Sequence, residues 1–146
     1  MIKLLTGVLL FFSSSIFAQT NIDSIKIGQL KLTVVGIEND EGTIAVALSN
    51  SREDYESYET VYRSANIKIA DNKAEHLFDE LPFGEYAIKV YHDEDDDGEI
   101  DRNFLGIPSE DYGFSNNASA SFGPADYDDA KFIFDQKFLE IEINVD

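Results

Sequence analysis

The residues of this chain best suited to chemistry are the acidic ones at positions 93–101, where seven of nine side chains are carboxylates. Two carboxylates about 4 Å apart repel each other by roughly 1 kcal/mol even in water, and by more near a protein surface. A folded loop of this composition therefore needs a bound cation, or it must spread its side chains into solvent. The chemistry that this run indicates is the binding of a metal ion through oxygen atoms.

The spacing of the acidic residues favours the cation. Asp93 begins a pattern in which carboxylates occupy positions one, three, five and nine of a calcium-binding loop, and Gly98 stands at position six, where the chain must turn sharply. Calcium is the predicted metal because oxygen ligands on a flexible loop suit a large, hard ion that takes about six to eight contacts. The predicted ligands are Asp93, Asp95, Asp97, Glu99 (through its carbonyl) and Asp101.

The loop departs from a helical calcium-binding hand at one position. Position twelve, where such a hand places a bidentate glutamate, is Phe104, which cannot bind a metal. The remaining ligands must come from water or from other acidic or amide side chains. The alternative is a solvated acidic loop without specific affinity, which gives no reason for Gly98 at position six or Ile100 at position eight. The candidates for further ligands are Asn103, Glu110, Asp111, Asp126, Asp128 and Asp129.

Other reactive patterns are weak. His76 and His92 are the only histidines, and the chain has no cysteine, so a zinc site of three or four well-spaced ligands is not indicated. His92 is interpreted as a residue at the end of a strand. No Gly-x-Ser-x-Gly nucleophile motif is present, and 29 acidic residues allow a carboxylate pair to be drawn almost anywhere. We predict no catalytic residue.

The N-terminus has the pattern of a secretory signal peptide. Lys3 precedes a short apolar run, and small residues lead to a predicted cleavage after Ala18. The run is shorter than the roughly 20 residues of a membrane-spanning helix, although an uncleaved anchor is the alternative. The prediction is export to the periplasm or the extracellular space, with no membrane insertion after cleavage. No cysteine follows the run, so lipid anchoring is not expected.

The remaining chain is predicted to be a leader at 19–28 and one domain at 29–146. A formal net charge of −18 repels nucleic acid and anionic lipid and attracts cations. Without cysteine the domain has no disulfides, so packing must stabilise it, with or without a bound ion.

Apolar residues alternate along most of the domain, which indicates strands with one buried face. Segments 30–34 and 44–48 flank an Asp/Gly turn and are predicted to form a β-hairpin. Residues 52–63 suit a short helix or a structured loop, with three tyrosines covering the edge of the core. The span 93–129 is too long for an ordinary connection, and its apolar residues predict that it packs down. The further strands are 65–70, 74–78, 86–91, 131–135 and 138–145, which makes about seven in an antiparallel, all-β sandwich of transthyretin-like or Ig-like type.

Several short motifs, taken together, resemble one family of exported bacterial proteins. They include Leu81-Pro82-x-Gly84-x-Tyr86, the acidic loop itself, Asn103-Phe104-Leu105-Gly106-Ile107-Pro108, Tyr112-Gly113-Phe114 and Asp129-Ala130-Lys131-Phe132. The family is domain of unknown function 2141. The resemblance implies a β-sandwich and export, and it supplies no catalytic residue. The first motif is also similar to a turn of transthyretin-like and carboxypeptidase regulatory-type sandwiches, which is an analogy of fold alone.

These observations lead to one preferred hypothesis and two alternatives. The preferred one is an exported, non-enzymatic, calcium-binding accessory or binding domain, whose partners are the calcium ion and a glycan or another exported protein. The first alternative is a calcium-dependent carbohydrate-binding module that stacks Tyr112 or Phe114 on a sugar ring. The second is a small secreted hydrolase. Phe104, Leu105 and Ile107 are expected, with these two aromatics, to form a satellite core or a recognition surface.

Overall fold

The structure is a computed structural model that describes residues 25–57, 59–121 and 123–146. The predicted signal peptide at 1–18 and residues 19–24 of the predicted leader lie outside the described residues. None of the helices in the described part of the chain is long and apolar enough to cross a membrane.

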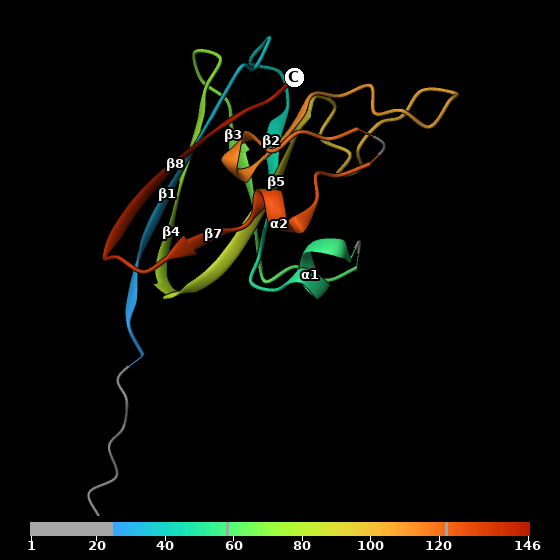
Figure 1. The fold of residues 1–146 in the computed structure, drawn as a ribbon. Coiled ribbons are helices and arrows are strands. Elements are labelled where there is room, and N and C mark those ends of the chain that lie inside the picture. Colours follow the sequence, from blue (N-terminus) through green and yellow to red (C-terminus); the bar gives the residue numbers. More distant parts are fainter. Residues whose placement is uncertain (1–24, 58, 122) are drawn as a thin grey trace, which may run out of the picture.

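The chain folds into two packed β-sheets, which confirms the predicted all-β sandwich (Figure 1). One sheet has the strand order β4-β1-β8, and the other has the order β3-β2-β5-β6, with β7 also paired to β5. The strands are β1 (Ile27–Val35), β2 (Thr43–Ser49), β3 (Arg63–Lys68), β4 (Ala74–Pro82), β5 (Gly84–Asp93), β6 (Tyr112–Phe114), β7 (Phe132–Phe134) and β8 (Phe138–Asn144). The helices are α1 (Arg52–Glu56), η1 (Ser115–Asn117) and α2 (Tyr127–Ala130).

The core lies between the two sheets and is built from the alternating residues of their strands. Leu30, Leu32 and Val34 of β1 are fully buried, and the intervening residues of that strand are half-buried. The buried cluster continues into β2 and β5, where Ile44 and Ile88 are also fully buried. Burying an aliphatic side chain of this size stabilises the fold by about 1.5–3 kcal/mol, so this alternation is what holds the sheets together.

The pairing of β1 with β8 departs from the predicted antiparallel arrangement. These two strands run parallel, with Leu32 opposite Ile141 and Val34 opposite Ile143. The other pairings between named strands are antiparallel. Parallel neighbours need a long crossover, and here the whole second sheet lies between β1 and β8 in the sequence.

The predicted hairpin of 30–34 with 44–48 is wrong, because β1 and β2 belong to different sheets. The connection between them crosses from one layer to the other instead of turning back. The carboxylate of Asp40 in this connection accepts hydrogen bonds from the backbone nitrogens of Asp71 and Asn72 at 3.1 and 2.7 Å. The side-chain nitrogen of Asn72 also donates to the carbonyl of Ile37 at 2.9 Å. The connection is therefore fixed against the loop before β4.

The helix predicted within 52–63 exists as α1, which begins after a Ser51 cap whose hydroxyl accepts from the backbone nitrogen of Asp54. Tyr55 of this helix is buried, and Tyr62 is half-buried against the main core. Both positions agree with the prediction that these tyrosines cover the edge of the core. Tyr58 lies outside the described residues.

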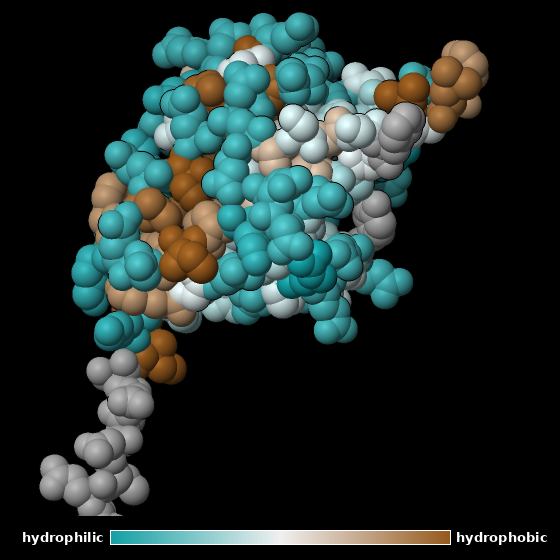
Figure 2. All heavy atoms as spheres, viewed as in Figure 1, coloured by the Kyte–Doolittle hydropathy of each residue, from teal (hydrophilic) through white to brown (hydrophobic). Residues whose placement is uncertain are grey.

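The long connection after β5 divides into two parts with opposite environments. Its second part packs down as predicted, because Phe114 of β6 and Tyr127 of α2 join a second buried cluster with Tyr55 and Ala87. Its first part, residues 102–108, projects from the body of the molecule, and we call it the apolar finger (Figure 1). Figure 2 shows apolar side chains gathered at the end of this projection.

Candidate metal centre

The predicted calcium loop begins at the end of the central strand of the second sheet. Asp93 is the last residue of β5 and is only 1% exposed. Its two carboxylate oxygens accept hydrogen bonds from the backbone nitrogens of Asp97 at 3.1 Å and Gly98 at 3.0 Å. The chain can curl back over Asp93 because Asp96 and Gly98 adopt positive φ angles of 58° and 82°. For Gly98 this conformation carries no steric cost.

Three of the predicted ligands converge. Asp93, Asp95 and Asp97 each offer one carboxylate oxygen, and these atoms lie within 4.8 Å of one another. Oxygen ligands at about 2.3–2.6 Å from a calcium ion are at most about 5 Å apart, so one ion could contact all three. We call these residues the aspartate triad. Asp93 is buried whereas Asp95 and Asp97 are exposed, which leaves the outer side of such an ion open to water.

Backbone N–H groups partly offset the charge of the triad. Asp95 accepts from the nitrogen of Asp97 at 3.2 Å, and Asp97 accepts from the nitrogen of Glu99 at 2.8 Å. Each of these bonds links a carboxylate to a nitrogen two residues further on, which is the local geometry that acidic residues favour in turns. The spacing of the acidic residues therefore determines the shape of the loop as well as its charge.

The connection between β1 and β2, together with the first residue of β2, holds the acidic loop from the side. The Thr43 hydroxyl donates to Asp96 at 2.9 Å, and the Asn39 amide donates to Glu94 at 2.8 Å. His92 is buried, and its Nε2 donates to the carbonyl oxygen of Glu41 at 2.8 Å. His92 is thus the penultimate residue of β5, as interpreted from the sequence, and it ties this strand to the neighbouring connection.

Glu110 closes the loop from the other side. Its two carboxylate oxygens accept hydrogen bonds from the backbone nitrogens of Glu94 at 3.1 Å and Asp101 at 3.0 Å. One side chain therefore bridges the two ends of the acidic segment. Of the six residues that the sequence offers as additional ligands, Glu110 is the one whose carboxylate is seen to bond to the loop, and the neighbouring Asp111 pairs with His92 through its backbone carbonyl at 2.8 Å.

The negative charge of this region also affects the pKa of Tyr91. Burial raises the pKa of its phenol, and the negative charges of Asp93, Glu110, Asp97 and Glu99 raise that pKa further. Four carboxylates from both sides of the loop therefore act on one hydroxyl group. A divalent cation in the loop would oppose this effect.

The other predicted ligands lie outside the aspartate triad. Glu99 and Asp101 are exposed, and their carboxylates do not belong to the converging group found among the described side chains. The ligand predicted at Glu99 is its backbone carbonyl, which stays a prediction. The side-chain oxygen of Asn103 accepts from two backbone nitrogens of the apolar finger instead. Asp128 forms ion pairs with Arg52 at 2.7 Å and Lys131 at 3.1 Å. The acidic residues around α2 thus serve a different part of the fold.

A family model described as an uncharacterized protein conserved in bacteria (DUF2141) matches residues 32–142. The chain belongs to this family. The DUF2141 match covers most of the sandwich, from β1 to β8, and includes the acidic loop and the apolar finger. No curated protein and no solved structure gives a significant match. The family description carries no activity, so the function must be argued from the site itself.

Proposed function

We propose that this member of the DUF2141 family is an exported, non-enzymatic domain that binds calcium in the loop 93–101 and acts as an accessory or binding module. The observation that carries the proposal is the convergence of the aspartate triad at the end of β5, with Asp93 buried. Burying the charged carboxylate of Asp93 beside two others destabilises the fold, unless hydrogen bonds and a cation offset the lost hydration and the repulsion.

The donor set favours calcium over magnesium. Magnesium requires nearly ideal octahedral geometry at about 2.0–2.1 Å and gives up its water reluctantly. The loop at 93–101 instead offers several carboxylates, of which Asp95 and Asp97 are exposed, and a carbonyl at Glu99 for an ion with flexible coordination. Glu110 bonds to the backbone of this loop and is available to a larger coordination sphere.

Calcium in the loop would act mainly on stability. The ion would cross-link the end of β5 to residues 95–97, and these are already tied to the start of β2 by the hydrogen bond from Thr43 to Asp96. The bound ion would therefore hold the end of the sandwich from which the long connection departs. Such a structural role needs no catalytic group. The bound ion would also keep the apolar finger in a defined position.

A thermal melt of the purified protein tests this stabilisation. Calcium at a hundred times its dissociation constant adds about 2.7 kcal/mol to the free energy of unfolding, which for a domain of this size raises the melting temperature by roughly 10 °C. We expect that shift between chelator and millimolar calcium, and a smaller one with magnesium. A melting temperature that is the same in chelator and in calcium would contradict the proposal.

Two observations weigh against the alternative functions. Phe114 is only 6% exposed, and Tyr112 is half-buried with its ring 5.8 Å from that of Phe114. Both line one surface hollow, but neither ring is fully exposed to a sugar. Two surface hollows are lined by residues that include one carboxylate side chain each, Asp79 in one and Asp146 in the other. Neither hollow presents the pair of carboxylates that glycoside hydrolysis requires.

Export is part of the proposal and rests on the pattern of residues 1–18. N-terminal sequencing of the protein from the cells that make it would test this part separately. We expect the mature chain to begin at Gln19. An intact Met1 in the mature protein would contradict cleavage.

A further inference from the structure

The apolar finger exposes three large apolar side chains at one place. Phe104 is 96% exposed, Leu105 is 68% exposed and Ile107 is 55% exposed. Single exposed apolar residues are common on protein surfaces, whereas a group of them on one projecting segment marks an interaction site. The finger stands away from the body of the sandwich, and its apolar side chains lie at the far end (Figures 1 and 2).

Hydrogen bonds within the finger fix the shape of the backbone that carries these side chains. The Asn103 nitrogen donates to the Ile107 carbonyl at 2.8 Å, and the Gly106 nitrogen donates to the Asn103 carbonyl at 2.8 Å. The Asn103 side-chain oxygen accepts from the nitrogens of Leu105 at 2.9 Å and Ile107 at 3.2 Å. Arg102 adds a bond to the Gly106 carbonyl at 3.1 Å. The finger is therefore an organised turn that presents its apolar groups ready for binding, which lowers the entropic cost of association.

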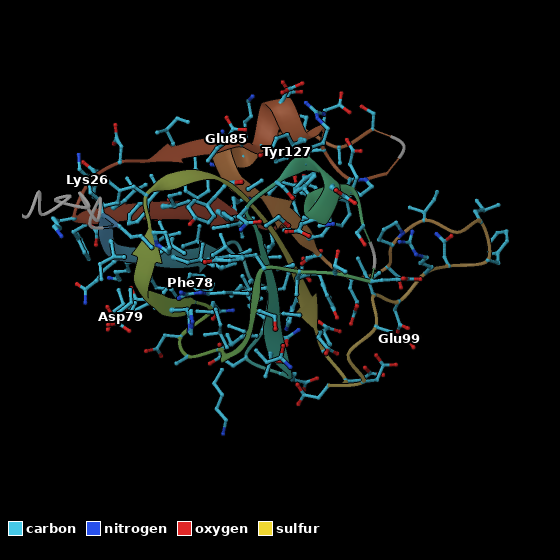
Figure 3. The ribbon with its side chains drawn as sticks, turned by 90° about the horizontal axis from the view of Figure 1, so that it is seen from below. Lys26, Phe78, Asp79, Glu85, Glu99 and Tyr127 are labelled. Atoms are coloured by element: carbon cyan, nitrogen blue, oxygen red, sulfur yellow. The ribbon has the colours of Figure 1, made fainter. Side chains whose placement is uncertain are left out.

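The surroundings of the finger are strongly acidic. Residues 93–111 contain nine carboxylates and one basic side chain, Arg102, which gives a formal charge of −8. A single bound calcium ion would leave −6, so the surroundings stay negative with or without metal. Figure 3 shows Glu99 close to the base of the projecting loop, at the opposite end of the molecule from Lys26 and Asp79.

The exposed apolar side chains and the acidic surroundings together indicate which kind of partner binds the finger. A second copy of the chain carries the same net charge of −18 and is repelled, and so is an anionic membrane. A glycan stacks its sugar rings on aromatic side chains, and of the three exposed apolar residues only Phe104 is aromatic, whereas Leu105 and Ile107 are aliphatic. We propose that the finger is the docking surface for a protein partner with an apolar pocket rimmed by lysine and arginine side chains. The apolar groups would supply affinity, and the opposite charges would supply orientation and speed of association.

The finger does not need calcium for its shape, because the hydrogen bonds within it join residues 102–108 to one another and do not involve the aspartate triad. A failure of the calcium proposal would therefore leave the docking proposal standing.

The experiment introduces the photo-crosslinking residue p-benzoylphenylalanine in place of Phe104 in the full chain, produced in its own cells. We expect one discrete adduct to a second protein, and mass spectrometry of the joined peptides should place the contact in an apolar pocket bordered by basic residues. The absence of an adduct would overturn the proposal. So would adducts only to another copy of this chain or to lipid, or a contact on an acidic or wholly polar surface.

The partner found in this way is then purified and titrated in calcium-containing buffer with three forms of the chain. We expect Phe104→Ser to weaken binding at least tenfold relative to the wild type. Leu77→Ser, which removes a 45% exposed apolar side chain from β4, should change binding less than twofold. The wild-type complex should also weaken when the salt concentration rises. Equal binding by the wild type and Phe104→Ser would overturn the proposal, and since Phe104 is exposed, the variant is expected to fold normally.

Discussion

Gly42 lies directly against the main chain of Asp93, at the point where the acidic loop leaves β5. A Cβ atom at position 42 would overlap the Asp93 carbonyl oxygen and lie 2.7 Å from the Cα of Glu94. Gly42 also has a φ of 64°, which side chains disfavour. The β1–β2 connection and the candidate metal loop are therefore packed backbone to backbone, with no room for a side chain between them.

Replacing this glycine should damage the fold and the metal site together. We expect Gly42→Ala to lower the free energy of unfolding by at least about 2 kcal/mol, from backbone strain and from the displaced loop. Gly84→Ala is the matched control, since its added Cβ would make only ordinary contacts of 3.5 Å and longer. Denaturant unfolding measures both variants. Equal stability of Gly42→Ala and Gly84→Ala would show that the close approach is not maintained in solution.

Ser115 links the long connection to the central strand. Its buried hydroxyl accepts from the Ile88 nitrogen at 2.9 Å and donates to the Ala130 carbonyl at 2.6 Å. Ser115→Ala would leave both buried groups unsatisfied and should cost about 1–3 kcal/mol in unfolding free energy. The exposed Ser119→Ala is the control and should be nearly neutral. A neutral Ser115→Ala would mean that water replaces the hydroxyl.

The Asn103 side chain is predicted to keep the apolar finger in shape. In Asn103→Ala the nitrogens of Leu105 and Ile107 lose their acceptor. Their amide hydrogens should therefore exchange faster with solvent, while the melting temperature stays within about 1 °C because the finger lies outside the core. Hydrogen exchange followed by NMR measures this directly. Unchanged exchange at these two amides would contradict the role of Asn103.

His76 should make stability depend on pH. Burial against the core lowers the pKa of this histidine below its ordinary value near 6.5, and its ring packs edge-on against Phe78 at 4.6 Å. The unfolded chain then binds the proton more readily than the folded one, so the stabilising effect of the neutral ring is present above about pH 6.5 and is lost as the pH falls. Between pH 7 and 5 we expect the wild type to lose stability more steeply than His76→Phe. Parallel stability curves for the two proteins would contradict this.

The strands could be predicted from the sequence because the alternation that marks a buried face is local. The alternation at Leu30, Leu32 and Val34 would look the same in a hairpin with β2 or in a sheet with β4 and β8, so it could not predict which strands pair. β6 is only three residues long and contains Gly113, too short a segment to show a period of two. Its strand character comes from pairing with β5.

In the candidate site, too, local features could be predicted from the sequence and long-range contacts could not. Asp93, Asp95 and Asp97 could be predicted because their convergence depends on spacing within one loop. Glu110 could be named only as one of several candidates, because the chain must fold back before its carboxylate reaches the loop. The sequence left two environments open for Phe104, a satellite core or a recognition surface, because nothing local to the residue decides between them. The structure places Phe104 in the solvent, on a segment whose hydrogen bonds join residues 102–108 to one another.

Isothermal calorimetry shows most directly whether the aspartate triad binds calcium. We expect saturable calcium binding to the wild type. We also expect loss of that binding in the double variant Asp95→Ala with Asp97→Ala. The control double variant Asp135→Asn with Glu142→Gln removes two exposed carboxylates outside the loop and should bind calcium like the wild type. Absence of calcium heat below millimolar in the wild type, or equal binding by both double variants, would contradict a calcium site at the aspartate triad.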